Sequence, residues 1–124
     1  MLLDSVIVID YLNRISAAQA FLDEVQHQAT ISPITRAEVL AGYPHAQMKA
    51  VAAALDGFEL LAINAQTADL AARFRNDPKR RSKLKLPDAF QAALATQYGV
   101  KLATRNTHDF DPGRDAFVLV PYTL

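Results

Sequence analysis

The chain has 124 residues, of which 51% are hydrophobic, so residues 1–124 can form one domain with a buried core. It contains no cysteine, which excludes disulfide bonds, thiolate metal sites and cysteine nucleophiles, and leaves carboxylates and histidines as metal ligands. Its formal net charge of zero argues against a protein that coats nucleic acid along its whole surface.

The first residues carry no sign of an export signal. The opening stretch MLLDSVIVIDYLN is apolar but is interrupted by Asp4 and Asp10, and it has no basic leader or small-residue cleavage site. No apolar run approaches the roughly 20 residues that cross a bilayer. We therefore expect a cytoplasmic protein that does not enter the membrane.

Five short apolar runs, bounded by polar or turn-forming residues, are predicted as β-strands. They cover residues 1–4, 29–32, 58–63, 100–104 and 116–120. Helical patterns between them cover residues 17–27, 33–41, 46–56, 65–76 and 87–98. Gly99 is predicted to end the last helix in the left-handed conformation. The stretch VIVIDYL is β-branched but continues into a polar, helix-like segment, so we expect a helical turn directly after Asp4.

The alternation of strands and helices predicts an α/β fold. Such βαβ units form a parallel sheet, here of about five strands, with helices on both faces. In open sheets of this kind, ligands bind outside the carboxyl ends of the strands. The residues that follow the predicted strands are therefore the first candidates for a functional site.

Two acidic residues come after predicted strands. Asp4 follows Leu2 and Leu3, and Asp109 follows the fourth predicted strand in the segment LATRNTHDFD. A polar turn at the surface would explain either residue alone, and Asn106 is a common turn residue. Loops at strand ends often carry function, so both carboxylates are also candidates for a site.

Two more acidic residues lie on predicted helices. Glu38 lies in SPITRAEVLAG, where Ser32 can cap the helix, but the spacing of Thr35 and Glu38 also matches a capping box. Asp88 follows a proline in the first helical turn, where the helix dipole favours a negative charge. Each of these acids therefore has a structural explanation beside a functional one.

A cluster of these carboxylates would require a cation. Carboxylates that converge raise one another's pKa, so three or four together are costly unless a positive charge binds them. Mg²⁺ and Mn²⁺ prefer oxygen ligands of this kind. Such an ion activates water and stabilises charge on phosphoryl oxygens, which makes a phosphodiester the natural substrate.

Four sequence blocks contain these acids and span nearly the whole chain. They are LLDS at residues 2–5, ITRAEVLAG at 34–42, LPDA followed by two alanines at 86–93, and ATRNTHDF at 103–110. In these blocks and in their order, the chain resembles the PIN-domain nucleases, specifically the VapC-like toxins of type II toxin–antitoxin pairs.

The resemblance implies a Rossmann-like, three-layer PIN fold and a metal-dependent endoribonuclease that acts on RNA. It also implies a homodimer that is neutralised by a cognate VapB-like antitoxin. The acidic ligands of one or two Mg²⁺ or Mn²⁺ ions would be Asp4, Glu38 and Asp88, with Asp109 completing the site. The hydroxyl groups of Ser5 and Thr104 would support carboxylates or a water.

Two positions depart from the family pattern. Many relatives have Asp-Thr-Asn where this chain has Asp4-Ser5-Val6, which keeps a hydroxyl group and loses an amide. Some relatives have an acidic residue at the position of Asn106. The fourth position of the site is therefore either Asp109 itself or a water held by Asn106.

The segment that leads into Asp88 is strongly basic. Residues 73–85, RFRNDPKRRSKLK, hold seven of the 13 Lys and Arg residues and only one acid, Asp77. These cations can position an RNA backbone, although a solvated loop or a surface for an acidic antitoxin segment would also account for them. The residues predicted to bind RNA are Arg73, Lys79, Arg80, Arg81, Lys83, Lys85 and Arg105.

Two other functions stay open at this level. A receiver-like signalling domain also gathers carboxylates and Mg²⁺ at strand ends, but it needs a phospho-accepting Asp after the third strand, where this chain has Asn64. A PIN module that binds RNA or an antitoxin without cutting is suggested by Val6 and Asn106.

Overall fold

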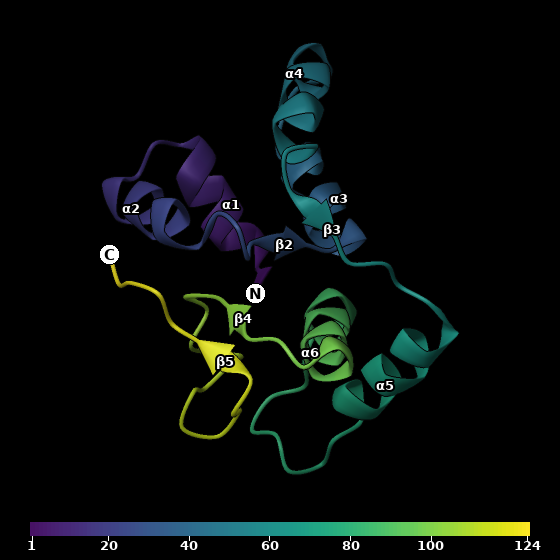
Figure 1. Ribbon diagram of the computed structural model, residues 1–124. Coiled ribbons are helices and arrows are strands. Elements are labelled where there is room, and N and C mark those ends of the chain that lie inside the picture. Colours follow the sequence, from purple (N-terminus) through teal and green to yellow (C-terminus); the bar gives the residue numbers. More distant parts are fainter.

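Five parallel strands form one sheet in the order β3-β2-β1-β4-β5, in a computed structural model that describes residues 1–124 (Figure 1). The strands are β1 (Leu2–Leu3), β2 (Thr30–Ile31), β3 (Glu59–Leu60), β4 (Leu102–Ala103) and β5 (Val118–Leu119). Every pairing is parallel, and β1 lies at the centre between β2 and β4. The predicted parallel sheet is confirmed, although each strand is shorter than predicted.

Six helices connect and flank the strands. They are α1 (Ser5–Leu12), α2 (Ser16–Val25), α3 (Pro33–Ala41), α4 (His45–Leu55), α5 (Ala65–Arg75) and α6 (Leu86–Tyr98). Five of them match the predicted helices to within two residues at each end. None of the helices combines the length and the apolar character that crossing a membrane requires.

The remaining helix, α1, spans eight residues and is longer than the helical turn predicted after Asp4. Its β-branched residues lower helix propensity, which is why the sequence predicts only a turn. Asp4 compensates at the helix start, because its backbone is extended and its side chain accepts a hydrogen bond from the Ser5 N–H. Ile7 and Val8 are fully buried, so packing against the sheet also stabilises the helix.

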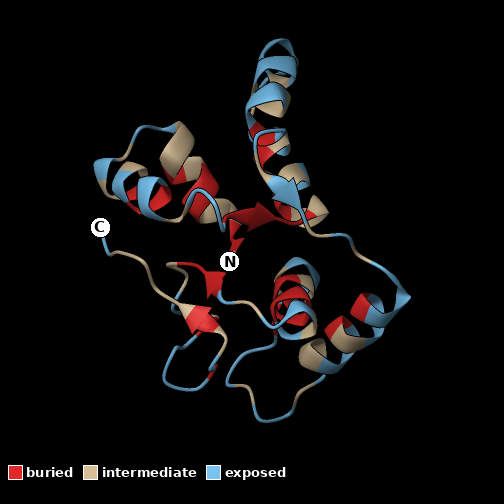
Figure 2. Ribbon diagram, in the orientation of Figure 1, coloured by how far each residue is buried: buried red, intermediate tan, exposed pale blue.

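The core has two parts, one on each face of the sheet. Consecutive strand residues point to opposite faces, so the neighbours Leu2 and Leu3 enter different clusters. One cluster joins Leu2 to α5 and α6, and the other joins Leu3 to residues of α1, α2, α3 and α4. Figure 2 shows buried residues on β1, β2, β4 and β5 and on the helix faces turned toward them, whereas the edge strand β3 is exposed. The predicted three-layer arrangement is therefore confirmed.

Local capping fixes where the helices near the sheet edge begin and end. The Ser32 side chain accepts a hydrogen bond from the Thr35 N–H at the start of α3, as predicted. Gly99 ends α6 with φ of 63°, in the left-handed region where glycine carries no steric penalty. The starts of α1 and α3 both lie directly after strands, so their first residues stand at the carboxyl edge of the sheet.

Candidate active site

Asp4 lies at the carboxyl end of the central strand and is only 5% exposed. Its Oδ1 accepts a 2.9 Å hydrogen bond from the Ser5 N–H, and its Oδ2 accepts a 2.7 Å bond from the Thr104 hydroxyl. The surface-turn explanation for Asp4 is therefore wrong. Both oxygens of this carboxylate are held in a defined orientation at the carboxyl edge of the sheet.

Hydrogen bonds also connect Asp4 to Asp109 through the loop that follows β4. The Thr104 Oγ1 accepts a 3.0 Å hydrogen bond from the Asn106 N–H. The Asn106 side-chain amide donates a 3.0 Å bond to Asp109 Oδ2. Asn106 is thus a hydrogen-bond partner of the Asp109 carboxylate.

Glu38 lies in the second turn of α3 and is exposed. The capping box is not formed, because the Thr35 hydroxyl donates to the Leu3 carbonyl and Ser32 is the cap. Partial burial and the negative charge of Asp4 raise the pKa of Glu38, while a hydrogen bond from Ser5 acts against this. The carboxylate of Glu38 therefore belongs to the same electrostatic environment as Asp4.

Asp88 has the most perturbed carboxyl group of the site. Burial raises the pKa of Asp88 to about 6, and the charges of Asp4, Asp109 and Glu38 act in the same direction, in that order. The positive charge of Lys85 acts against them. The charges of the other three sequence-predicted acids thus all act on Asp88 at one edge of the sheet.

This donor set fits a hard divalent cation. Carboxylate oxygens are its preferred ligands, and a bound cation offsets the repulsion that adds to the effect of burial on the pKa of Asp88. As the side chains stand, no three histidine, aspartate or glutamate residues lie close enough together to hold a metal ion directly. Mg²⁺ keeps several of its waters and needs only one or two carboxylates, so this spacing suits a largely hydrated ion.

Gln91 is a residue of the site that the sequence analysis missed. It is fully buried on α6, and its amide nitrogen donates to Thr35 Oγ1 at 2.7 Å and to Asp4 Oδ1 at 3.4 Å. Its amide oxygen accepts a 2.7 Å bond from the Ser32 hydroxyl. The only sequence signal is one polar residue among the apolar positions of AFQAALA.

Arg80 requires a correction to the predicted RNA-binding set. Its side chain is 5% exposed and forms a two-pronged ion pair with Asp115, with bonds of 3.0 and 2.9 Å. It also donates a 2.8 Å bond to the Asp109 carbonyl. The guanidinium group therefore links the basic segment to the loop of Asp109 by hydrogen bonds, and it is not available to bind a phosphate.

Arg105, which is also predicted to bind RNA, is likewise paired with an acid, but its side chain stays 32% exposed. Its guanidinium group donates to both oxygens of Asp10, at 2.6 and 2.9 Å, and the Tyr122 hydroxyl donates to the same carboxylate at 2.9 Å. The hydrogen bond from Arg105 is the main cause that holds the pKa of Asp10 below its usual value. This network ties the loop after β4 to α1 and to the last residues of the chain.

The remaining predicted RNA-binding residues are exposed. They are Arg73, Lys79, Arg81, Lys83 and Lys85. A small hollow of about 50 Å³ separates the basic segment from the β4–β5 loop, and Arg81, His108 and Asp109 are among the residues that line it. The basic segment therefore borders the acidic site in space as well as in sequence.

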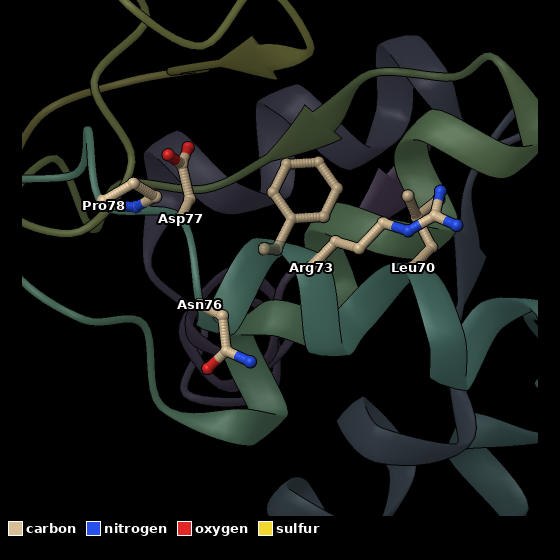
Figure 3. Close-up of a pocket in the computed structure, with 6 residues that line it drawn as sticks. Leu70, Arg73, Asn76, Asp77 and Pro78 are labelled. Carbon is tan, nitrogen blue, oxygen red and sulfur yellow. The ribbon is translucent and has the colours of Figure 1, made fainter.

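The largest hollow of the surface is elsewhere, at the end of α5 (Figure 3). It has a volume of about 500 Å³ and is lined by Leu70, Arg73, Phe74, Asn76, Asp77 and Pro78. None of the four acids contributes to it, so its size does not make it the reaction site. Of the predicted cations, Arg73 alone lines it.

Comparisons with known proteins agree with this geometry. A family model described as PIN domain matches residues 1–111. A toxin–antitoxin complex from Klebsiella pneumoniae contains a chain that is 33% identical, with a TM-score of 0.87 over 99% of this chain and 98% of that one.

More distant structures share the fold. FitAcB from Neisseria gonorrhoeae is 25% identical, with a TM-score of 0.79 over 99% of each chain. DNA-bound VapBC from Salmonella typhimurium is 19% identical, with a TM-score of 0.81 over 98% of this chain and 97% of that one. No curated protein sequence matches the chain.

Proposed function

This chain belongs to the PIN domain family, and from that premise we propose that it is a metal-dependent endoribonuclease. The observation that carries the proposal is the convergence of four carboxylates at the carboxyl edge of the sheet, where burial raises the pKa of Asp88 to about 6 and repulsion by Asp4, Asp109 and Glu38 acts in the same direction. A divalent cation relieves that repulsion, and a phosphodiester is the substrate class that such a cation serves.

We assign Mg²⁺ or Mn²⁺ to Asp4, Glu38 and Asp88, with Asp109 or a water held by Asn106 at the fourth position, and some of these contacts would pass through waters that the ion keeps. When bound, such an ion lowers the pKa of a water molecule and stabilises charge on the phosphoryl oxygens. The protein supplies the geometry: Thr104 fixes one oxygen of Asp4, and the Asn106 amide fixes one oxygen of Asp109. Carboxylates that are already oriented need less rearrangement when the cation and the substrate bind.

The exposed cations of the basic segment are assigned to the RNA backbone. Lys83 and Lys85 lead directly into α6, on which Asp88 occupies the first turn. Phosphate contacts of this kind position a nucleic acid without reading its bases, and they weaken as salt rises. We therefore expect RNA binding by this segment to depend strongly on ionic strength and weakly on sequence.

Cleavage of RNA with and without metal tests the activity. We expect purified protein to cleave RNA in Mg²⁺ or Mn²⁺, to stop when EDTA is added, and to recover when excess Mn²⁺ is restored. The Asp4→Asn protein, purified in parallel, controls for contaminating nucleases. Undiminished cleavage in EDTA would refute the metal-dependent mechanism, and RNA binding without cleavage in either metal would favour a binding-only module.

We further propose that the enzyme is the toxin of a toxin–antitoxin pair and acts as a homodimer. The support for the toxin role is the 33% identity to a chain of a toxin–antitoxin complex over almost the full length of both chains, and the homodimer is what the resemblance to the VapC-like toxins implies. Expression in a bacterial host should arrest growth, and co-expression of a short VapB-like antitoxin encoded beside it should restore growth. Continued growth of cells that contain the soluble wild-type protein would contradict the toxin role.

A further inference from the structure

Helix α6 brings two side chains to the acidic site, one helical turn apart. Asp88 lies in its first turn, and Gln91 follows three residues later, fully buried. A buried amide has a large desolvation cost unless all its hydrogen-bonding groups have partners. Gln91 meets this condition through Ser32, Thr35 and Asp4.

The surrounding hydrogen bonds allow only one orientation of the Gln91 amide. The Thr35 hydroxyl donates its single proton to the Leu3 carbonyl, so toward Gln91 it can only accept. The Ser32 hydroxyl accepts from the Thr35 N–H and donates its own proton to the Gln91 oxygen. A flipped amide would turn its oxygen toward the Thr35 oxygen and the Asp4 carboxylate. Its contacts with these two groups would then become repulsive.

From this geometry we propose that Gln91 is a positioning residue that fixes the plane of the Asp4 carboxylate for cation binding. Its amide contacts Oδ1, while the Thr104 hydroxyl contacts Oδ2, so the two residues restrain the two oxygens of one carboxylate. This inference rests on the proposed metal-dependent function. It also couples the position of α6, which carries Asp88, to the orientation of Asp4.

The Gln91→Met variant tests the proposal, because methionine keeps the length of the side chain and removes its hydrogen bonds. We expect the affinity for Mn²⁺, measured by calorimetry without RNA, to fall about 10- to 100-fold, as for other residues that orient metal ligands. With RNA, kcat should fall while KM stays unchanged. Mn²⁺ affinity within twofold of the wild-type value would overturn the proposal.

A matched control separates positioning from general destabilisation. Thr67 is also fully buried, and its hydroxyl bonds to Asn64 and Gln97, residues that do not contact any of the four acids. Thr67→Val should lower the Tm about as much as Gln91→Met does, while it leaves the affinity for Mn²⁺ unchanged. If Gln91→Met does not fold, Thr35→Val removes the hydroxyl that holds the amide in place, and the same affinity criterion applies.

The proposed function and the role of Gln91 can fail separately. If wild-type protein neither binds Mn²⁺ nor cleaves RNA, the proposed function fails. In that case, crystal structures of the wild-type and Gln91→Met proteins still decide the role of Gln91. A rotated Asp4 carboxylate in the variant supports positioning, and an unchanged Asp4 overturns it.

Discussion

The Thr104 hydroxyl donates a 2.7 Å hydrogen bond to Asp4 Oδ2 and so joins the ends of two neighbouring parallel strands. Both residues are buried, and both come directly after their strands. The bond depends on the parallel register of β1 and β4, which pairs Leu3 with Ala103. The orientation of the first acid is therefore a consequence of the sheet itself.

Thr104→Val should lower RNA cleavage about 10- to 100-fold, because valine keeps the shape of the side chain and frees one oxygen of Asp4. Single-turnover cleavage in Mn²⁺ measures the effect. Thr30→Val is the matched control, since the Thr30 hydroxyl on the next strand bonds only to the Met1 carbonyl. Equal activity of the two variants would show that the Thr104 hydroxyl has no part in the site.

Asp88 should make the metal-free protein less stable as pH rises. Its pKa is about 6 in the fold against 3.8 as a free residue, so the folded protein binds the extra proton between these values. The free energy of unfolding then falls as pH rises from about 4 to about 6 and stays low above that. Asp88→Asn removes this penalty and should be more stable than the wild type by about 2 kcal/mol at neutral pH.

Urea unfolding in EDTA between pH 4 and 7.5 measures this effect. The quantity compared is the free energy of unfolding of the wild type and of Asp88→Asn at each pH. The difference should shrink toward zero as pH falls toward 4. Mg²⁺ at neutral pH should stabilise the wild type more than the variant. A difference that is independent of pH would contradict the raised pKa of Asp88.

The contribution of Asp10 to the free energy of unfolding should depend on pH in the opposite way to that of Asp88. The pKa of Asp10 is lowered in the fold, so its contribution to stability is present above its unfolded pKa of about 4 and is lost as pH falls below it. Asp10→Asn should cost about 2 kcal/mol near neutral pH, because it leaves the Arg105 guanidinium without its charged partner. The surface pair of Arg36 and Asp56 is the control, and Asp56→Asn should cost less than about 1 kcal/mol. Equal costs for the two variants would refute a special role for Asp10.

Substitutions of Arg80 and Lys83, two cations of the basic segment, should have different effects: the first should lower stability, and the second should weaken RNA binding. Arg80→Ala leaves Asp115 buried without a partner and should cost about 3 to 5 kcal/mol of unfolding free energy. Lys83→Ala should change stability by less than about 0.5 kcal/mol but weaken RNA binding and reduce its salt dependence by roughly one phosphate contact. RNA binding is best measured on an inactive Asp88→Asn background. Unchanged RNA affinity in Lys83→Ala would exclude that residue from the interface.

Local chemistry predicts the helix ends that carry a recognisable cap. Ser32 before a proline and Gly99 after the last helix form caps that are recognisable in sequence and present in the structure. Strand lengths are harder, because an apolar run continues beyond the paired residues. In residues 116–120, for example, only Val118 and Leu119 form the strand, and the Val118 N–H bonds back to Asp115 in a turn.

Long-range side-chain pairs could not be predicted from the sequence. Arg80 and Arg105 belong to basic patterns typical of RNA binding. In the structure, however, Arg80 pairs with an acid 35 residues away and Arg105 with an acid 95 residues away. Gln91 lies 87 residues from Asp4, and no periodicity or motif relates the two. Only the assembled sheet and its packed helices determine which polar groups meet.

The rate of RNA cleavage by Asp88→Asn at saturating Mn²⁺, beside that of the wild type, tests the central claim most directly. The substitution keeps the shape of the side chain and removes one of the four charges that require a cation. We predict that the variant folds, binds RNA, and cleaves it at least about 100-fold more slowly, since a lost charge interaction of about 3 kcal/mol has that effect. Cleavage at the wild-type rate would contradict the assignment of these acids to a metal-dependent nuclease site.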